Sequence, residues 1–550
     1  MRTPEFIPGH AIPFLGGGGA LELARQQRRQ QTRHRRVLRM RALGMWWYRI
    51  VLIVLGGIVA AILGQFTLDY AKYIFAGIAA LVLIVLAIRR VESGLLLMAI
   101  VTTAFFPQLF AVKSLAVYAV MPLLLLLFFA LLVKAALRLH EVILPSIWAI
   151  WPQLGLITMA IISTVTIQLT WTRSVPRKIG GSPAMYDELL GIALCFIPLI
   201  AILVTTAALT KKDRFIEYIQ RAYLILAFIA AMVVIIEFKR INATVYTFRY
   251  AEPSIFWMKL KGLAQLLCLG AMIAYGRALY ATRWRMRLFY TVLLALNLLA
   301  TYFTLDNSWW LEIGIALIVM TCAYSRRLFV FFCMCALPLL PLLKAELSKL
   351  SSVKTADYYR LIIWQDALRV WSKQPLLGVG PGDFWVYDQR FTLLPRLVRN
   401  CSATGLCVAH NGYLQVLAEM GPIGLFFWLA SIVVIAFLSI QLMSRSPVLK
   451  QRGNKLLGFI GLNLTCESEK RYGRMLGLTA LGLVCGSAVA DFFSGGFFLP
   501  ARQIDSFQWI PDALSSWVIW GCVIYQDKLW RIARRRSKAT VEDRGSPVST

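Results

Sequence analysis

The 550-residue chain carries little charge, and most of the charge that it carries is positive. Charged residues make up 15% of the sequence, and 27 acidic residues stand against 58 lysines and arginines, for a formal net charge of +31. Hydrophobic residues make up 59%, whereas a soluble domain rarely exceeds about half. The scarcity of charge therefore excludes an ordinary soluble protein and indicates a chain that lies largely in a bilayer.

Cysteine patterns that bind zinc are absent as well. The ten cysteines include no CxxC pair and no zinc spacing. Most of them fall in apolar runs, where cysteine behaves as a small hydrophobic residue. Cys401 and Cys407 are the exceptions, and their spacing leaves open whether they form a disulfide.

Long apolar runs recur through the chain. A run of about 20 apolar residues is long enough to cross a bilayer as an α-helix. We predict about 14 such spans and therefore an all-α, polytopic transmembrane helical bundle. The first run lacks a cleavage pattern, so we expect no cleavable signal peptide. The expected spans are residues 46–64, 73–88, 94–112, 115–133, 147–169, 189–209, 222–238, 263–281, 288–304, 309–324, 328–343, 422–442, 473–491 and 512–527.

Basic residues lie beside the expected spans. One basic tail precedes the first span, a second follows the last, and clusters such as Arg89-Arg90 and Arg326-Arg327 fall between spans. Lysine and arginine close to membrane segments mark the cytoplasmic side. We therefore expect both termini and these clusters in the cytoplasm. We interpret the charge as a topology signal that also attracts anionic lipid, and we expect no nucleic-acid partner.

The expected spans divide the chain into five parts. Residues 1–45 form a basic cytoplasmic tail, 46–343 hold spans 1 to 11, 344–421 form one long extracytoplasmic loop, 422–527 hold spans 12 to 14, and 528–550 form a second basic cytoplasmic tail. The long loop is polar, aromatic and basic. A long loop on a rigid scaffold is where function tends to be found.

An amphipathic helix and a glycine-rich turn are expected within this loop. Residues 355–373 carry apolar side chains at spacings of three and four, and Pro375 ends the pattern. The stripe consists of Leu361, Trp364, Leu368 and Trp371. The glycines that follow, Gly378, Gly380 and Gly382, allow a tight turn with close backbone approach. Their spacing does not match a dinucleotide-binding fingerprint.

A second short helix is expected after His410. Asn411 is a suitable N-cap, and Gly421-Pro422 ends the helix before the next span. The positive end of a helix disfavours the imidazolium form, so His410 is expected to be neutral and able to accept a proton. Of the four histidines, only His410 falls outside the cytoplasm in the predicted topology.

Four motifs follow one another in this region. They are YRLIIW at 359–364, QPLLGVGPGDF at 374–384, HNGYLQ at 410–415 and EMGPIG at 419–424. The ordered set, within a multi-span layout, resembles the O-antigen ligase and polymerase superfamily. The resemblance implies a metal-independent glycosyltransferase of the cytoplasmic (inner) membrane that needs no cofactor. Such a protein transfers a glycan from a polyprenyl diphosphate carrier, undecaprenyl diphosphate, to an acceptor hydroxyl on a glycan or a lipid.

The resemblance also implies roles for three residues. His410 corresponds to the base that deprotonates the acceptor hydroxyl, and Arg360 to the arginine that holds the donor diphosphate. The sequence FRYAEP at 248–253 resembles an earlier extracytoplasmic arginine motif, which makes Arg249 a further diphosphate ligand. The alternatives are an ion pair of Arg360 with an aspartate of its own helix, and a membrane-interface anchor for Arg249.

The sequence departs from the family pattern at one point. Members often carry a Ser-Arg pair before Gly/Ala-Trp at the outer end of a span, where this chain has Asp306 and Asn307. One diphosphate contact is therefore missing or comes from another residue, such as Arg249. Two other functions stay open. A flippase or transporter of lipid-linked glycan needs charges inside its spans, which are nearly absent here; the loss of Ser-Arg favours a non-catalytic member of a polysaccharide-synthesis complex.

Overall fold

The computed structural model describes sixteen main stretches of the chain, all within the larger of two compact units, Ala79–Thr550. The described residues are 108–112, 115–118, 124–125, 127–129, 131–132, 144–171, 184–209, 214–240, 254–255, 258–259, 263–304, 307–336, 354–384, 409–444, 463–493 and 515–532.

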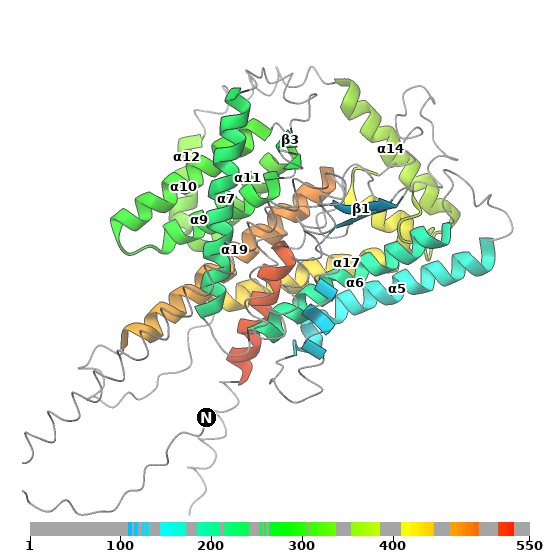
Figure 1. The fold of residues 1–550 in the computed structure, drawn as a ribbon, viewed down its shortest axis with the longest axis horizontal. Helices are drawn as coiled ribbons and strands as arrows, with labels where there is room; N and C mark the ends of the chain where they lie inside the picture. Colours follow the sequence, from blue (N-terminus) through cyan, green and yellow to red (C-terminus); the bar gives the residue numbers. More distant parts are fainter. Residues whose placement is uncertain are drawn as a thin grey trace, which may run out of the picture. The chain divides into compact units, whose positions relative to one another are not determined.

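These stretches are helical apart from two short antiparallel hairpins (Figure 1). The hairpins pair β1 (Gln108–Val112) with β2 (Leu115–Tyr118), and β3 (Ser254–Ile255) with β4 (Met258–Lys259). The helices are α5 (Ile147–Trp171), α6 (Ala184–Ala208), α7 (Arg214–Arg240), α9 (Ala264–Tyr280), α10 (Trp284–Thr304), α11 (Asn307–Tyr324), α12 (Arg326–Ala336), α14 (Lys354–Lys373), α17 (Gly412–Ser444), α19 (Asn463–Phe493) and a C-terminal helix at 515–532.

Six of the described helices are long and apolar enough to cross a membrane. The qualifying stretches are Ile147–Ile167, Gly191–Ala208, Ile216–Lys239, Trp284–Thr304, Gly412–Ser444 and Tyr472–Phe492. Several of these helices turn large apolar side chains outward, as α17 does with Val433 and Phe437, which are 65% and 56% exposed. Such a surface suits contact with lipid tails and does not suit water. The protein is therefore a multi-pass helical membrane protein.

Most of the expected spans in the described part of the chain coincide with helices. Those predicted at 147–169, 189–209, 222–238, 263–281, 288–304, 309–324, 422–442, 473–491 and 512–527 each overlap one helix. The spans expected at 46–64 and 73–88 lie outside the described residues. The total of about 14 spans therefore stays a prediction.

The predicted spans at 94–112 and 115–133 are wrong where they meet. Residues 108–112 and 115–118 form the antiparallel hairpin, with Phe110 opposite Val117 and Val112 opposite Leu115. Helix resumes only at Leu124 among the described residues. Aromatic and β-branched residues favour strands, and hydropathy alone cannot assign a short apolar run to helix or strand.

The predicted span at 328–343 also differs from the structure. The helix found there, α12, has 11 residues and ends at Ala336. At 1.5 Å per residue it is about 16 Å long, whereas the hydrocarbon core is about 30 Å thick. Its end precedes Leu337-Pro338, and the residue before a proline is disfavoured in helical geometry.

Glycines let α19 approach α11 closely. A Cβ on Gly482 would lie 2.6 Å from Cγ of Met320, and one on Gly486 would lie 2.6 Å from the Glu312 carbonyl oxygen. The Ser487 hydroxyl donates a hydrogen bond of 2.9 Å to the Glu312 carboxylate within this contact. Small residues at membrane-helix interfaces have this effect because they bring two backbones together.

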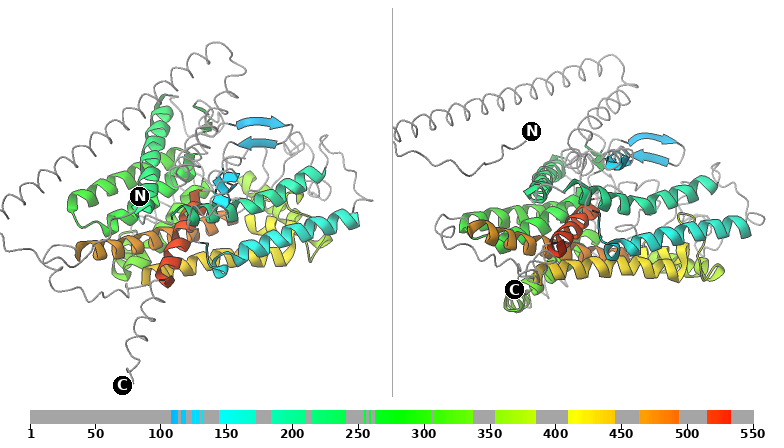
Figure 2. Two further views of the ribbon diagram at one scale, coloured as in Figure 1. Left: turned by 60° about the horizontal axis from the view of Figure 1, so that its bottom comes forward. Right: turned by 90° about the horizontal axis from the view of Figure 1, so that it is seen from below.

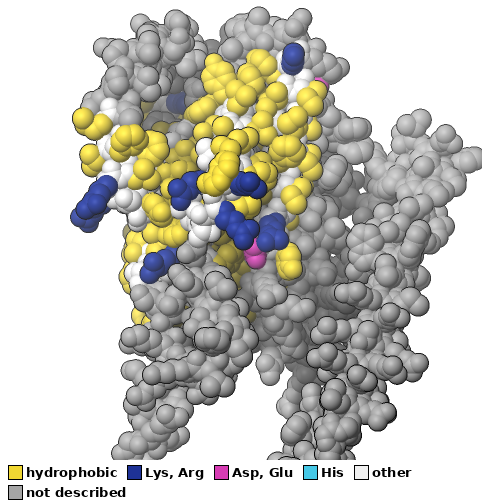
Figure 3. All heavy atoms as spheres, turned by 90° about the vertical axis from the view of Figure 1, so that its left-hand side faces the viewer, with side chains coloured by type: hydrophobic (Ala, Val, Ile, Leu, Met, Phe, Trp, Pro, Cys, Tyr) yellow, Lys and Arg dark blue, Asp and Glu magenta, His cyan; other side chains and the backbone are white. Residues whose placement is uncertain are grey.

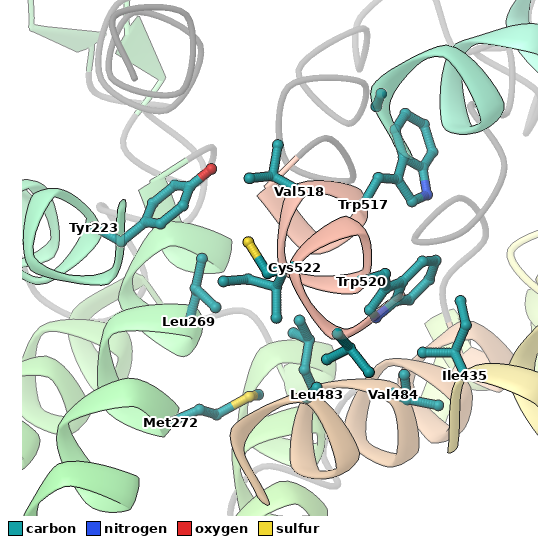
Figure 4. Packing of buried hydrophobic residues seen from close by; sticks show 14 of the residues in the cluster. Tyr223, Leu269, Met272, Ile435, Leu483, Val484, Trp517, Val518, Trp520 and Cys522 are labelled. Carbon is teal, nitrogen blue, oxygen red and sulfur yellow. The ribbon is translucent and has the colours of Figure 1, made fainter. Parts of the chain in front are cut away.

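The C-terminal helix completes the main hydrophobic core (Figure 4). Its Trp517, Trp520 and Cys522 are almost fully buried. They lie among side chains of α7, α9, α17 and α19, including Tyr223, Leu269, Met272, Ile435, Leu483 and Val484. Elsewhere α17 packs against α5 as well as α19, and α5 packs against α6 (Figure 2).

Candidate active site

Helix α14 forms where the sequence predicts it, but its buried face is not the predicted stripe. Leu361 and Leu368 of that stripe are 54% and 43% exposed. The buried residues are instead Ala367 and Val370, which join a small cluster with residues of α5, α17 and the following turn. Two small side chains allow α14 to come close to α17, while the larger leucines face outward. Spacing alone could not distinguish these two apolar faces.

The glycine-rich turn after α14 is held against a break in α17. Gly421 has φ 68 and ψ −174, so the helix is interrupted there, as the sequence predicts. Pro422 has no N–H and cannot donate to the Ala418 carbonyl one turn earlier. The amide of Val379 donates to that carbonyl instead, at 2.9 Å. The break thereby becomes an attachment point for the turn.

Glu419 takes part in the same attachment. Its backbone carbonyl accepts hydrogen bonds from the Gly380 amide, at 2.9 Å, and from the Ser163 hydroxyl of α5, at 3.1 Å. Its side-chain carboxylate accepts one from the Gln415 amide group, at 3.2 Å. Residues from α5, the turn and α17 therefore meet at one position in the EMGPIG motif.

His410 lies at the beginning of α17 in a left-handed conformation. Its φ of 49 makes it the one non-glycine residue with positive φ in the described part of the chain. The next residue, Asn411, caps the helix as predicted, because its side-chain oxygen accepts a 3.0 Å hydrogen bond from the Leu414 amide. Such a backbone is rare for histidine and is found where a side chain must be aimed.

The first turn of α17 is also fixed to the end of α19. The Tyr413 hydroxyl donates a 2.6 Å hydrogen bond to the Ala488 carbonyl, and its ring packs edge-on against Trp428. A Cβ on Gly412 would lie 3.3 Å from the carboxyl carbon of Asp491, which is fully buried. The helix that presents His410 therefore rests on a second membrane helix.

The structure brings His410 and Arg360 together. Burial lowers the pKa of His410 to about 4, and the nearby guanidinium of Arg360 lowers the pKa further in the same direction. Both effects disfavour the imidazolium form. His410 is therefore a neutral imidazole at physiological pH, in agreement with the expectation from the sequence, although burial rather than the helix end is the main cause.

Several predicted site residues cannot be placed with these two. Arg249, Cys401, Cys407 and Asp306 lie outside the described residues. Asn307 is the first residue of α11. Arg360 forms no ion pair with Asp366 within the part of the chain that the structure describes, so that alternative for Arg360 has no support there.

Sequence reasoning missed the part that α19 plays in the site. Asp491 was visible only as an acidic residue near the end of an expected span. The structure places its carboxylate beside Gly412, and Phe492 places its ring centroid 5.4 Å from that of Trp364 on α14. A buried acid in an otherwise uncharged span was the available signal.

Replacing Gly378 with alanine is expected to destabilise the fold by about 2–4 kcal/mol. Gly378 has φ 70, and an added Cβ would lie 2.5 Å from the Glu419 carbonyl oxygen and the Met420 nitrogen. Neither backbone atom can move without disturbing α17. The measurement is the thermal unfolding midpoint of the purified protein in detergent.

Gly314→Ala is the matched control for this change. Gly314 lies inside α11, and a Cβ there would meet nothing within 4 Å. Alanine also has the better helix propensity, so the midpoint should stay the same or rise slightly. Equal midpoints for the two variants would contradict the tight packing of the turn on α17.

Comparison with known proteins agrees with this geometry. Residues 255–429 match the protein family described as O-antigen ligase. The matched region contains both His410 and Arg360 and all four motifs. No individual curated protein matches the chain. The resemblance carried by the motifs is thereby confirmed: the chain contains an O-antigen ligase domain at residues 255–429 and belongs to the O-antigen ligase superfamily.

Proposed function

We propose that the protein is a metal-independent membrane glycosyltransferase that moves a glycan from a polyprenyl diphosphate carrier to an acceptor hydroxyl. The family supports the coarser statement that it is a glycosyltransferase-type membrane enzyme with a role in polysaccharide assembly. The observation that carries the finer proposal is the pairing of a neutral His410 with a guanidinium, Arg360, at the start of a membrane helix.

In the proposed reaction, His410 accepts the proton of the acceptor hydroxyl. The acceptor oxygen then bonds to the anomeric carbon of the donor glycan, and the bond from that carbon to the carrier diphosphate breaks. The electron pair leaves with the diphosphate, whose charge Arg360 and Arg249 neutralise. The proton on His410 returns to solvent, and polyprenyl diphosphate is released.

A weak base in the free protein becomes a better base in the donor complex. With Arg360 as its charged neighbour, the imidazole has a low pKa. A bound diphosphate would bring negative charge beside Arg360 and offset its effect, which raises the pKa of His410. His410 would thus gain basicity when the donor is in place, which favours proton transfer in the productive complex.

The proposed topology follows from the site and the basic clusters. Residues 344–421, with His410 and Arg360, form the catalytic loop on the far side of the cytoplasmic membrane, where the acceptor is found. Spans 1 to 11 (46–343) and 12 to 14 (422–527) hold it, and both basic tails, 1–45 and 528–550, lie in the cytoplasm.

The function is tested with the purified protein in liposomes that contain polyprenyl diphosphate-linked glycan and candidate acceptors. We expect glycan to appear on an acceptor together with free polyprenyl diphosphate, with chelator present. Movement of intact lipid-linked glycan across the bilayer without transfer would identify a flippase. Neither transfer nor movement with any acceptor would favour a non-catalytic member of a synthesis complex.

Transfer should also depend on pH in a defined way. The base must be neutral, and the pKa of His410 in the free protein is about 4. We therefore expect kcat/KM for the donor to be flat above about pH 5 and to fall about tenfold per pH unit below about 4. The limb of kcat should lie at higher pH, because the diphosphate raises the pKa in the complex. A kcat/KM limb near the ordinary histidine value would contradict the buried site.

A further inference from the structure

The helices carry a second polar site at the end opposite His410. Helix α19 has Asp491 at the His410 end and Tyr472 close to its other end, about 28 Å away at 1.5 Å per residue. Tyr472 lies near Arg277 of α9, close enough for an electrostatic interaction. The ends of α9 and α11 meet here too, since the Tyr324 hydroxyl donates a 3.1 Å hydrogen bond to the Leu279 carbonyl.

Arg277 is a buried cation held by neutral groups. Its side chain is 8% exposed. One terminal nitrogen donates to the Tyr290 hydroxyl of α10 and the other to the Gln220 side-chain oxygen of α7, both at 3.3 Å. The guanidinium carbon also lies 5.7 Å from the Tyr290 ring centroid. Three helices therefore converge on one positive charge.

Acidic side chains near this end already have arginine partners. Glu217 pairs with Arg221 on α7, and Asp527 pairs with Arg531 on the C-terminal helix. Within the residues that the structure describes, Arg277 forms no ion pair. A cation buried in a membrane bundle without an anion is costly, so the arrangement calls for a negative ligand.

The polar atoms around Arg277 that lack partners are hydrogen-bond donors. They are the Arg277 Nε, the Gln220 Nε2 and the Tyr472 hydroxyl, all buried and without a hydrogen-bond partner in the structure. A phosphate presents several acceptor oxygens to such a set, and a guanidinium suits its geometry. The donors therefore match an oxyanion rather than a sugar or a metal ion.

The surface outside this site favours lipid as the source of the anion. Arg283, Arg285 and Arg287 follow at the turn between α9 and α10, and all are exposed. Trp284 and Phe289 beside them are 70% and 53% exposed. Figure 3 shows Lys and Arg side chains gathered among hydrophobic ones on this side of the molecule. Arginines interleaved with exposed apolar residues suit the headgroup region of an anionic bilayer.

We propose that Arg277, Gln220 and Tyr472 bind the phosphate of an anionic phospholipid at the end of the helix bundle remote from His410. Tyr290 orients the guanidinium through its hydroxyl and ring. The site is independent of the proposed transferase reaction, because it uses other residues at the opposite end of α19. The bound lipid would hold α7, α9, α10 and α19 together.

The test uses the full-length protein in nanodiscs of phosphatidylcholine, with phosphatidylglycerol added stepwise. The readouts are the thermal unfolding midpoint and the lipid retained in native mass spectrometry. For the wild type we expect a rising midpoint and one retained phosphatidylglycerol. Arg277→Met should lose roughly 10- to 100-fold in phosphatidylglycerol affinity, since a charged hydrogen-bonding group is removed.

The same variant distinguishes a binding role from a structural one. In phosphatidylcholine alone, Arg277→Met should unfold at or above the wild-type midpoint, because a buried charge without an anion has been removed. A variant destabilised equally in both lipids would overturn the proposal. Gln220→Ala keeps the charge and removes one donor, so it should retain phosphatidylglycerol less well while folding normally; wild-type retention by this variant would also count against the site.

Two further arms address other sources of the effect. Arg287→Gln removes an exposed arginine at the same end, and it should keep most of the stabilisation by phosphatidylglycerol. An equal loss in Arg287→Gln would show diffuse surface attraction and overturn the buried site. Inorganic phosphate added in place of phosphatidylglycerol should give no comparable stabilisation; if it does, the ligand is free phosphate and the lipid assignment is wrong.

Discussion

Replacing His410 with asparagine is expected to lower the rate of glycan transfer by about 10²- to 10⁴-fold, because general-base catalysis is lost. Asparagine tolerates the left-handed backbone that His410 adopts, with φ 49, so the turn before α17 should be kept. It cannot take up a proton from the acceptor hydroxyl. The measurement is the single-turnover rate of transfer with saturating lipid-linked donor.

The control for His410→Asn is His140→Asn, which changes a histidine expected on the cytoplasmic side. That variant should transfer glycan at the wild-type rate. Both variants should insert into the membrane and unfold at similar temperatures. A normal rate for His410→Asn would remove His410 from the mechanism and leave the acceptor to be activated by another group.

Replacing Arg360 with glutamine is expected to reduce transfer by about 10²- to 10³-fold, since a cation beside the leaving diphosphate stabilises the transition state. A second effect distinguishes this variant from other inactive ones. The Arg360 guanidinium holds the pKa of His410 down, so its removal should raise that pKa. The acid limb of kcat/KM should therefore move to higher pH in Arg360→Gln.

Two further substitutions separate charge from geometry. Arg360→Lys keeps the positive charge but lacks the planar guanidinium, so it should leave the acid limb near the wild-type position and recover only part of the rate. Arg369→Gln removes an exposed arginine of the same helix and should change the rate less than about twofold. An unchanged acid limb in Arg360→Gln would mean that Arg360 does not act on His410.

Much of the site's local structure could be predicted from sequence because it depends on short-range chemistry. Asn411 caps α17 and Gly421-Pro422 interrupts it through properties of those residues alone. The membrane helices in the described part of the chain could be predicted equally well from their long apolar runs.

Other features depend on contacts that no local pattern records. The choice of Ala367 and Val370 as the buried face of α14 follows from how closely α17 approaches, which the spacing of Leu361 and Leu368 does not reveal. The nearness of Arg360 to His410 was implied only by the family resemblance. Asp491 beside Gly412 requires knowing that α19 ends where α17 begins.

The interruption at Gly421 gives the protein a natural seam. Above it, the two turns of helix that follow His410 are bonded to the glycine-rich turn and to Ser163; below it, α17 continues as an ordinary membrane helix. Tilting or sliding of the lower part need not carry the imidazole with it. Chimaeras with other members of the superfamily should therefore keep their chemistry when joined after Gly421, and lose it when the junction separates residues 378–380 from 418–419.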